Sequence, residues 1–132
     1  MLDVMLEEII IPGFYETDAL GHINNTVVPM WFEKTRAPVF RLFTPDLDPK
    51  KWALIIVKIE VEYLRQISYQ EPVTIKTGIG DIGNSSFVIR QELFQEGEQA
   101  ARGQSTMVHF DYAQQKSAPL TEDIRSELEK LQ

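Results

Sequence analysis

YETDALGHINNTVVPMWFEKTR, residues 15–36, is the stretch around which the rest of the chain is arranged. It begins as a polar loop, turns at Gly21 and continues as an apolar segment typical of a helix. Asn24 or Asn25 is a natural N-cap, because a side-chain amide oxygen there can accept a hydrogen bond from a free backbone N–H of the first turn. The sequence therefore predicts a polar loop that leads directly into the N-terminus of a helix.

The loop carries a carboxylate, Asp18, a few residues before the expected helix. The first N–H groups of a helix have no intrahelical partner, and they make its N-terminus electropositive. A tight turn at Gly21 would bring the Asp18 carboxylate close to these donors. This arrangement suits acyl transfer, in which the donors hold a developing oxyanion while the carboxylate attacks or activates water. The competing interpretation of Asp18 is a turn-forming residue, since Asp is common in such loops.

Three other stretches accompany this loop: WFEKTR at residues 31–36, VEYLRQI at 61–67 and SSF at 85–87. Together with D-x-x-G-H-x-N-N at residues 18–25, they resemble the hotdog-fold acyl-CoA thioesterases of the 4-hydroxybenzoyl-CoA thioesterase group over nearly the whole chain. The resemblance implies a thioester hydrolase with an acyl-CoA substrate and no metal or redox cofactor. The chain differs from this family at one position: the third residue after the paired asparagines is often tyrosine in the family and is Val28 here. The difference affects the expected wall of the acyl pocket and not the carboxylate.

The resemblance and the chemistry of the side chains together suggest roles for individual residues. Asp18 acts as nucleophile or general base, and His22 binds the thioester carbonyl, positions water or is simply a loop histidine bonded to the backbone. Asn25 contributes its backbone N–H as an oxyanion donor at the helix start. Arg65 and Arg90 are candidates for phosphate contacts, because arginine offers a planar fork of donors. The expected substrate-binding residues are Gly21, Asn24, Arg65, Ser86 and Arg90. The competing interpretations are that Asn24 fixes the loop and that Ser86 belongs to a turn before a strand.

The helical segment contains a second carboxylate and several aromatic side chains. Glu33 is the rival to Asp18, but an ion pair with Arg36, three residues further along one helix face, is the simpler interpretation. Trp31, Phe32 and Phe40 either line the acyl pocket or belong to the core, where aromatic residues usually lie. We expect an aliphatic acyl chain in preference to an aryl group.

The pattern of apolar residues predicts an α+β domain spanning residues 1–132. A first strand is expected within residues 4–14, and a long helix over residues 26–43 that Pro38 kinks or ends. Four more strands follow near residues 52–63, 73–79, 87–93 and 99–112, and Thr121 caps a short C-terminal helix. Successive hairpins imply a five-stranded antiparallel sheet wrapped around the helix. In the second strand, alternation places one set of side chains on one face: Ile55, Val57, Ile59, Val61 and Tyr63.

Composition excludes several other classes of protein. The 132 residues contain no cysteine and only two histidines, so disulfides and thiolate metal sites are excluded. The net charge of −7 argues against a nucleic-acid partner, and it means that local Lys and Arg must attract the polyanionic coenzyme A. No apolar run approaches the roughly 20 residues of a membrane span, and the N-terminus lacks the basic region of a signal peptide. We therefore expect a cytoplasmic protein without membrane contact.

Two other functions remain open on the same fold. One is a non-catalytic protein that binds acyl-CoA or fatty acid, and the other is a hydratase or dehydratase, whose known motifs fit the spacing of Asp18 and His22 poorly. The sheet is expected to leave an edge strand with unpaired backbone groups, which proteins usually cover. The resemblance implies that two protomers join edge to edge with the active sites between them. We expect at least a homodimer, and a homotetramer built as a dimer of dimers is also expected.

Overall fold

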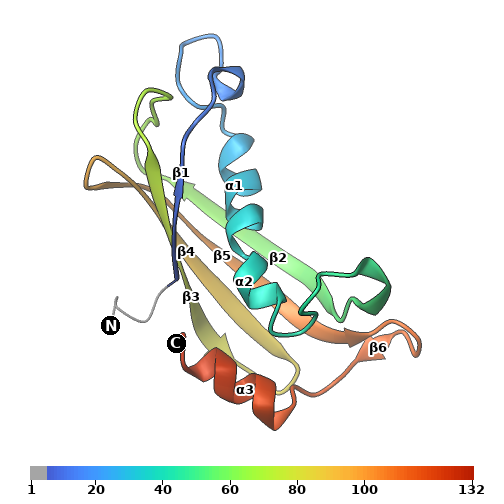
Figure 1. Ribbon diagram of the computed structural model, residues 1–132. Coiled ribbons are helices and arrows are strands. Elements are labelled where there is room, and N and C mark those ends of the chain that lie inside the picture. Colours follow the sequence, from blue (N-terminus) through green and yellow to red (C-terminus); the bar gives the residue numbers. More distant parts are fainter. Residues whose placement is uncertain (1–5) are drawn as a thin grey trace.

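Antiparallel strands curl around a helix in the computed structural model, which describes residues 6–132 (Figure 1). The strand order is β1-β3-β4-β5-β2, and a two-residue strand, β6, pairs with the end of β5. The bounds are β1 Leu6–Ile10, β2 Leu54–Tyr63, β3 Val73–Ile82, β4 Ser86–Gln95, β5 Glu98–Asp111 and β6 Lys116–Ser117. The predicted fold class and its five antiparallel strands are confirmed; the start of the first strand, predicted at residue 4, lies outside the described residues.

The helix inside the sheet is divided into α1, Val27–Thr35, and α2, Ala37–Phe40. Pro38 lies in the first turn of α2, where its missing N–H is tolerated, and the regular helix is interrupted just before it. The predicted effect of Pro38 is therefore confirmed. The C-terminal helix α3, Glu122–Glu129, begins where Thr121 Oγ1 accepts a hydrogen bond from the Ile124 N–H at 3.2 Å, so the predicted cap is also confirmed.

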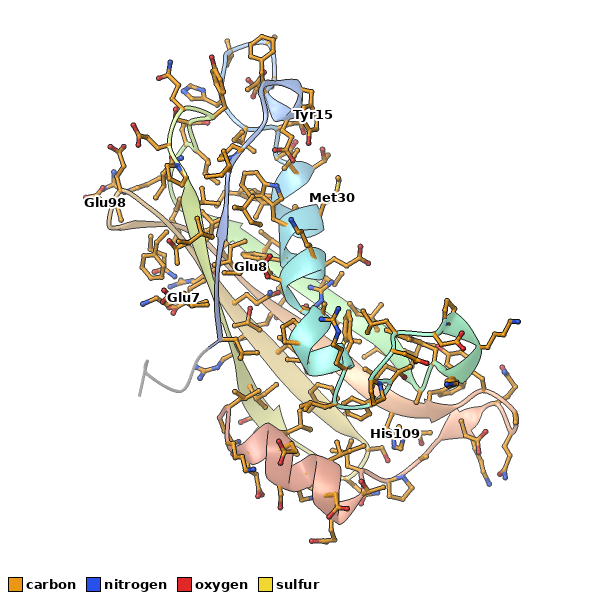
Figure 2. The ribbon with its side chains drawn as sticks, viewed as in Figure 1. Glu7, Glu8, Tyr15, Met30, Glu98 and His109 are labelled. Atoms are coloured by element: carbon orange, nitrogen blue, oxygen red, sulfur yellow. The ribbon has the colours of Figure 1, made fainter. Side chains whose placement is uncertain are left out.

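The core lies between the α1–α2 segment and the concave side of the sheet. Trp31 and Phe32 are only 4% and 2% exposed and pack with buried residues of β3, β4 and β5. Met30 lies on the opposite face of α1 and points away from the sheet (Figure 2). These two aromatic residues are therefore core residues and not the lining of an acyl pocket. The buried strand residues around them are Val73, Ile75, Leu93, Ala100 and Ala101.

Strand β2 contains a bulge that breaks the predicted alternation. Its pairing with β5 shifts register between Ile56 and Lys58. A bulge adds one residue to one strand, so side chains before and after it no longer follow a simple period of two. Ile55 and Ile59 consequently lie on opposite faces, and the prediction that Ile55 and Val57 continue the face of Ile59 is wrong. The alternation holds only from Ile59 to the end of the strand.

A buried polar network joins the helix to the sheet. Arg36 is 4% exposed, and its Nη1 donates to Ser105 Oγ at 2.8 Å and to Gln91 Oε1 at 3.4 Å. The Gln91 amide Nε2 in turn donates to the hydroxyl oxygens of Thr35 at 2.9 Å and Thr77 at 3.1 Å. Because buried polar groups require partners, these bonds fix the position of the helix over three adjacent strands, β3, β4 and β5.

The predicted ion pair between Glu33 and Arg36 is wrong. Glu33 is exposed, whereas Arg36 points into the sheet, and no ion pair joins them in the described part of the chain. Burial lowers the pKa of the Arg36 guanidinium from its ordinary value, and the charge of Glu33 opposes this shift. Sequence spacing places the two residues near one another, but the polar groups inside the sheet bind the arginine.

We expect Gln91→Ala to lower the free energy of unfolding by at least about 2 kcal/mol, because it leaves buried donors and acceptors without a partner and opens a cavity. Gln104→Ala is the matched control, since Gln104 is exposed on β5, and it should change stability by no more than about 0.5 kcal/mol. Urea unfolding at one fixed protein concentration measures both. Equal losses in the two variants would contradict a stabilising role for the network.

Candidate active site

The motif loop forms the tight turn that its sequence predicts. The Gly21 N–H donates to the Asp18 carbonyl at 3.1 Å, and the Asp18 N–H donates to the His22 carbonyl at 2.8 Å. Gly21 has a φ of +84°, a conformation that glycine adopts without a steric penalty. Asp18 Oδ1 accepts from the backbone N–H groups of Leu20 at 2.9 Å and His22 at 3.2 Å. The Asp18 carboxylate is thus held by the loop itself.

The loop is fastened to the rest of the molecule on two sides. The Ile23 N–H donates to the Ile67 carbonyl at 2.8 Å, and the Asn24 N–H donates to the Glu16 carbonyl at 2.8 Å. The Glu16 carboxylate also accepts from the indole Nε1 of Trp31 at 3.0 Å, which links the short 3₁₀ helix Phe14–Glu16 to α1. These bonds give the loop a fixed relation to the helix and to the segment that follows β2.

The entry into α1 differs in detail from the predicted cap. Asn24 Oδ1 accepts from the Thr26 N–H at 2.9 Å, and the Asn24 carbonyl accepts from the Val27 N–H at 2.9 Å. The helix N-cap is Thr26, and no side-chain hydrogen bond caps it, so the prediction of Asn24 or Asn25 as N-cap is wrong. Asn24 instead stabilises the turn before the helix. Within residues 6–132, the N–H of Asn25 makes no hydrogen bond.

A pocket of about 520 Å³ lies beside this turn and brings together three of the predicted residues: Asp18, Asn25 and Arg65. All three are exposed to solvent. Arg65 Nη1 is 2.6 Å from Glu98 Oε2 in an exposed ion pair. The other lining residues come from the motif loop, from α1 and from the end of β2 and the segment after it: Ile23, Val28, Tyr63, Leu64, Gln66 and Ile67.

The other predicted site residues do not line this pocket. Gly21 and His22 belong to the loop beside it, and the Nδ1 of His22 is buried without a hydrogen-bond partner among the described residues. Ser86 is the first residue of β4, and Arg90 is an exposed residue further along that strand. Their contact with substrate stays a prediction.

Tyr63 is a pocket residue to which the sequence assigns no functional role. Its hydroxyl donates to the backbone carbonyl of Asn25 at 2.5 Å, and partial burial raises the pKa of the phenol above its ordinary value. Periodicity describes Tyr63 only as the last side chain on one face of a strand. The available signal was its place at the end of that strand, immediately before Leu64 and Arg65.

The pocket therefore offers an exposed carboxylate and an unengaged backbone N–H. A carboxylate can act as nucleophile or general base, and a fixed N–H stabilises an oxyanion. In the described part of the chain, no cluster of three or more His, Asp or Glu side chains is placed to hold a metal ion. None of the helices in residues 6–132 combines the length and the apolar character of a membrane span.

Comparison with known proteins gives consistent results. Residues 12–128 match the family model described as the thioesterase-like superfamily. A predicted thioesterase from Bacillus stearothermophilus is 44% identical, with 96% of each chain covered and a TM-score of 0.93. A thioesterase from Thermus thermophilus, in complex with coenzyme A and zinc, is 28% identical, with 97% of this chain and 93% of that chain covered and a TM-score of 0.84.

A more distant structure shares the fold alone. It is a 4-hydroxybenzoyl-CoA thioesterase variant in complex with 4-hydroxybenzoyl-CoA, 16% identical, with 94% of this chain and 98% of that chain covered and a TM-score of 0.79. The resemblance found in the motif loop is thereby confirmed at the level of fold. Since the family match extends over most of the residues and includes the whole loop, the chain belongs to the thioesterase-like superfamily and is a thioester hydrolase with the hotdog fold.

Proposed function

We propose that the protein hydrolyses an acyl-CoA thioester to a free carboxylic acid and coenzyme A in the pocket between the motif loop and the end of β2. The observation that carries the proposal is the presence of the Asp18 carboxylate and the unengaged Asn25 N–H in one pocket. The coenzyme A complex of the Thermus relative supports the substrate class.

Asp18 has two possible reactions with the thioester. As nucleophile, its carboxylate attacks the carbonyl carbon, coenzyme A leaves as the thiolate, and water then hydrolyses the acyl-enzyme anhydride. As general base, it removes a proton from the water that attacks the same carbon. In both reactions the Asn25 N–H stabilises negative charge on the carbonyl oxygen. His22, adjacent in the loop, orients the carbonyl or the water.

Coenzyme A is anionic, and the protein has a net charge of −7, so local cations must attract it. Arg65 lines the pocket, and its partner Glu98 holds it only through an exposed ion pair. Such pairs contribute about 0–1 kcal/mol, so a phosphate can replace the Glu98 carboxylate at little cost. The acyl chain faces an aliphatic wall, which favours aliphatic over aryl substrates: Ile23, Val28, Leu64 and Ile67.

We further propose that two chains pair through β2. This strand lies at one edge of the sheet and exposes apolar side chains, among them Ile59, which is 50% exposed. An apolar edge strand with unpaired backbone groups is normally covered, and two-fold pairing with a second copy covers it. The pocket lies at the end of β2, so this pairing would place it at the interface. Ser86 and Arg90 would then contact substrate held at the partner's pocket.

The alternative to catalysis is a purely structural Asp18. The hydrogen bonds from the N–H groups of Leu20 and His22 to Asp18 Oδ1 favour this alternative, because they are the bonds of an Asx turn. Substitution of the carboxylate by an amide distinguishes the two, since an amide oxygen accepts the same turn bonds.

We expect Asp18→Asn to lower kcat by at least about 10²-fold with little change in KM, because the amide keeps the turn but is neither a base nor a useful nucleophile. Thiol release from a panel of acyl-CoA substrates measures the effect. Glu33→Gln is the matched control and should stay within a few-fold of wild type; His22→Ala should cost less than Asp18→Asn. If Asp18→Asn retains activity within a few-fold, Asp18 is structural.

Size-exclusion chromatography with light scattering at micromolar concentration should show a dimer or a larger assembly. Ile59→Glu should weaken that assembly, because it places a charge among the exposed apolar side chains of β2. Ile9→Glu is the control, since Ile9 is 64% exposed on the opposite edge strand, and the dimer should survive it. A stable, active wild-type monomer would refute the shared site.

A further inference from the structure

The two peptide groups on either side of the Asn25 α-carbon are both fixed. In the first, the Asn24 carbonyl accepts from the Val27 N–H at 2.9 Å. In the second, the Thr26 N–H donates to Asn24 Oδ1 at 2.9 Å and the Asn25 carbonyl accepts from the Tyr63 hydroxyl at 2.5 Å. The Tyr63 bond is the one that comes from outside the turn. The Asn25 N–H belongs to the first peptide group, and the Tyr63 bond acts on it through the α-carbon that the two groups share. The bond thereby anchors the turn that carries this N–H to a residue of the sheet.

Tyr63 is well suited to this bond. It is the last residue of β2, it is paired with Ala101 of the neighbouring strand β5, and it lines the same pocket as Asp18 and Asn25. A carbonyl only accepts, so the phenol must donate. A phenol is protonated at neutral pH, and partial burial raises its pKa further above the ordinary value.

We propose that Tyr63 is a positioning residue for thioester hydrolysis: its hydroxyl holds the Asn25 carbonyl and so keeps the neighbouring Asn25 N–H directed at the thioester oxygen. The inference rests on the proposed function, in which that N–H is the oxyanion donor. A donor in a firmly anchored turn stabilises the transition state without reorganising at the moment of reaction, whereas a donor in a loosely anchored turn must first be reoriented. Loss of the hydroxyl should therefore reduce the chemical step more than substrate binding.

The chain contains a matched control for the test. Tyr112 also donates its hydroxyl to a backbone carbonyl, that of Leu54, at 2.7 Å. Leu54 is the first residue of β2, so this bond is made at the end of the strand away from the pocket. The two tyrosines are similarly exposed, Tyr63 at 48% and Tyr112 at 43%. Tyr63→Phe and Tyr112→Phe thus each remove one comparable hydrogen bond and keep the ring.

We expect Tyr63→Phe to lower kcat about tenfold with KM within about twofold, a smaller effect than the roughly 10²–10³-fold loss of a whole oxyanion donor. Tyr112→Phe should keep wild-type kcat, and both variants should have similar Tm and the same mass by light scattering. Introducing 3-fluorotyrosine at position 63, which restores a hydroxyl, should restore kcat.

Equal kcat for the two phenylalanine variants would overturn the inference, as would a fall for Tyr63→Phe that 3-fluorotyrosine does not reverse. The comparison of Tyr63→Phe with the 3-fluorotyrosine protein applies even where Tyr63→Phe folds poorly. Asp18→Asn separates this failure from failure of the proposed function. An inactive Asp18→Asn with a fully active Tyr63→Phe rejects only the positioning role, whereas an active Asp18→Asn rejects the catalytic carboxylate whatever Tyr63 does.

Discussion

The close approach of Phe32 to β5 at Gly103 determines where the helix lies against the sheet. A Cβ on Gly103 would be 2.9 Å from Phe32 Cε2 and 3.0 Å from the Glu60 carbonyl oxygen, closer than packed atoms allow. Only glycine leaves room there for a ring that is 2% exposed. The helix can therefore pack closely against the concave face of the sheet, and the hydrogen bonds of Arg36 and Gln91 hold it in that position.

The candidate site depends on this position because each of its parts is bound to the helix or its entry. The Glu16 carboxylate binds the Trp31 indole and thereby attaches the motif loop to the helix. Tyr63, at the end of a strand, binds the carbonyl of Asn25. The carboxylate and the backbone donor thus belong to flexible kinds of structure, a loop and a turn, but are fixed by rigid neighbours. Such support is what catalytic groups need in order to stay in a productive geometry.

Much of this arrangement could be predicted from the sequence, and the failures have definite physical causes. Alternation predicted the strands because burial acts on every second side chain. The bulge at Val57 could not be predicted in this way, because the residues around it are also apolar and the sequence pattern does not change there. Spacing paired Glu33 with Arg36, yet the arginine binds Ser105, 69 residues away. The turn at Gly21 was predictable because it is local, whereas the bond from Tyr63 to Asn25 joins residues 38 apart.

The place of Tyr63 has a consequence for the relation between assembly and catalysis. The tyrosine ends the strand whose apolar side chains are exposed in a single chain, and the same strand is held to the rest of the sheet by β5 alone. An edge strand with one neighbour opens more readily than a strand with two, because fewer hydrogen bonds oppose its motion. Pairing with a second chain would supply the missing neighbour and steady the Tyr63 hydroxyl on Asn25. Dimerisation through β2 would then do more than cover apolar surface: it would hold the oxyanion donor in place, so that activity should depend on protein concentration near the dissociation constant of the dimer.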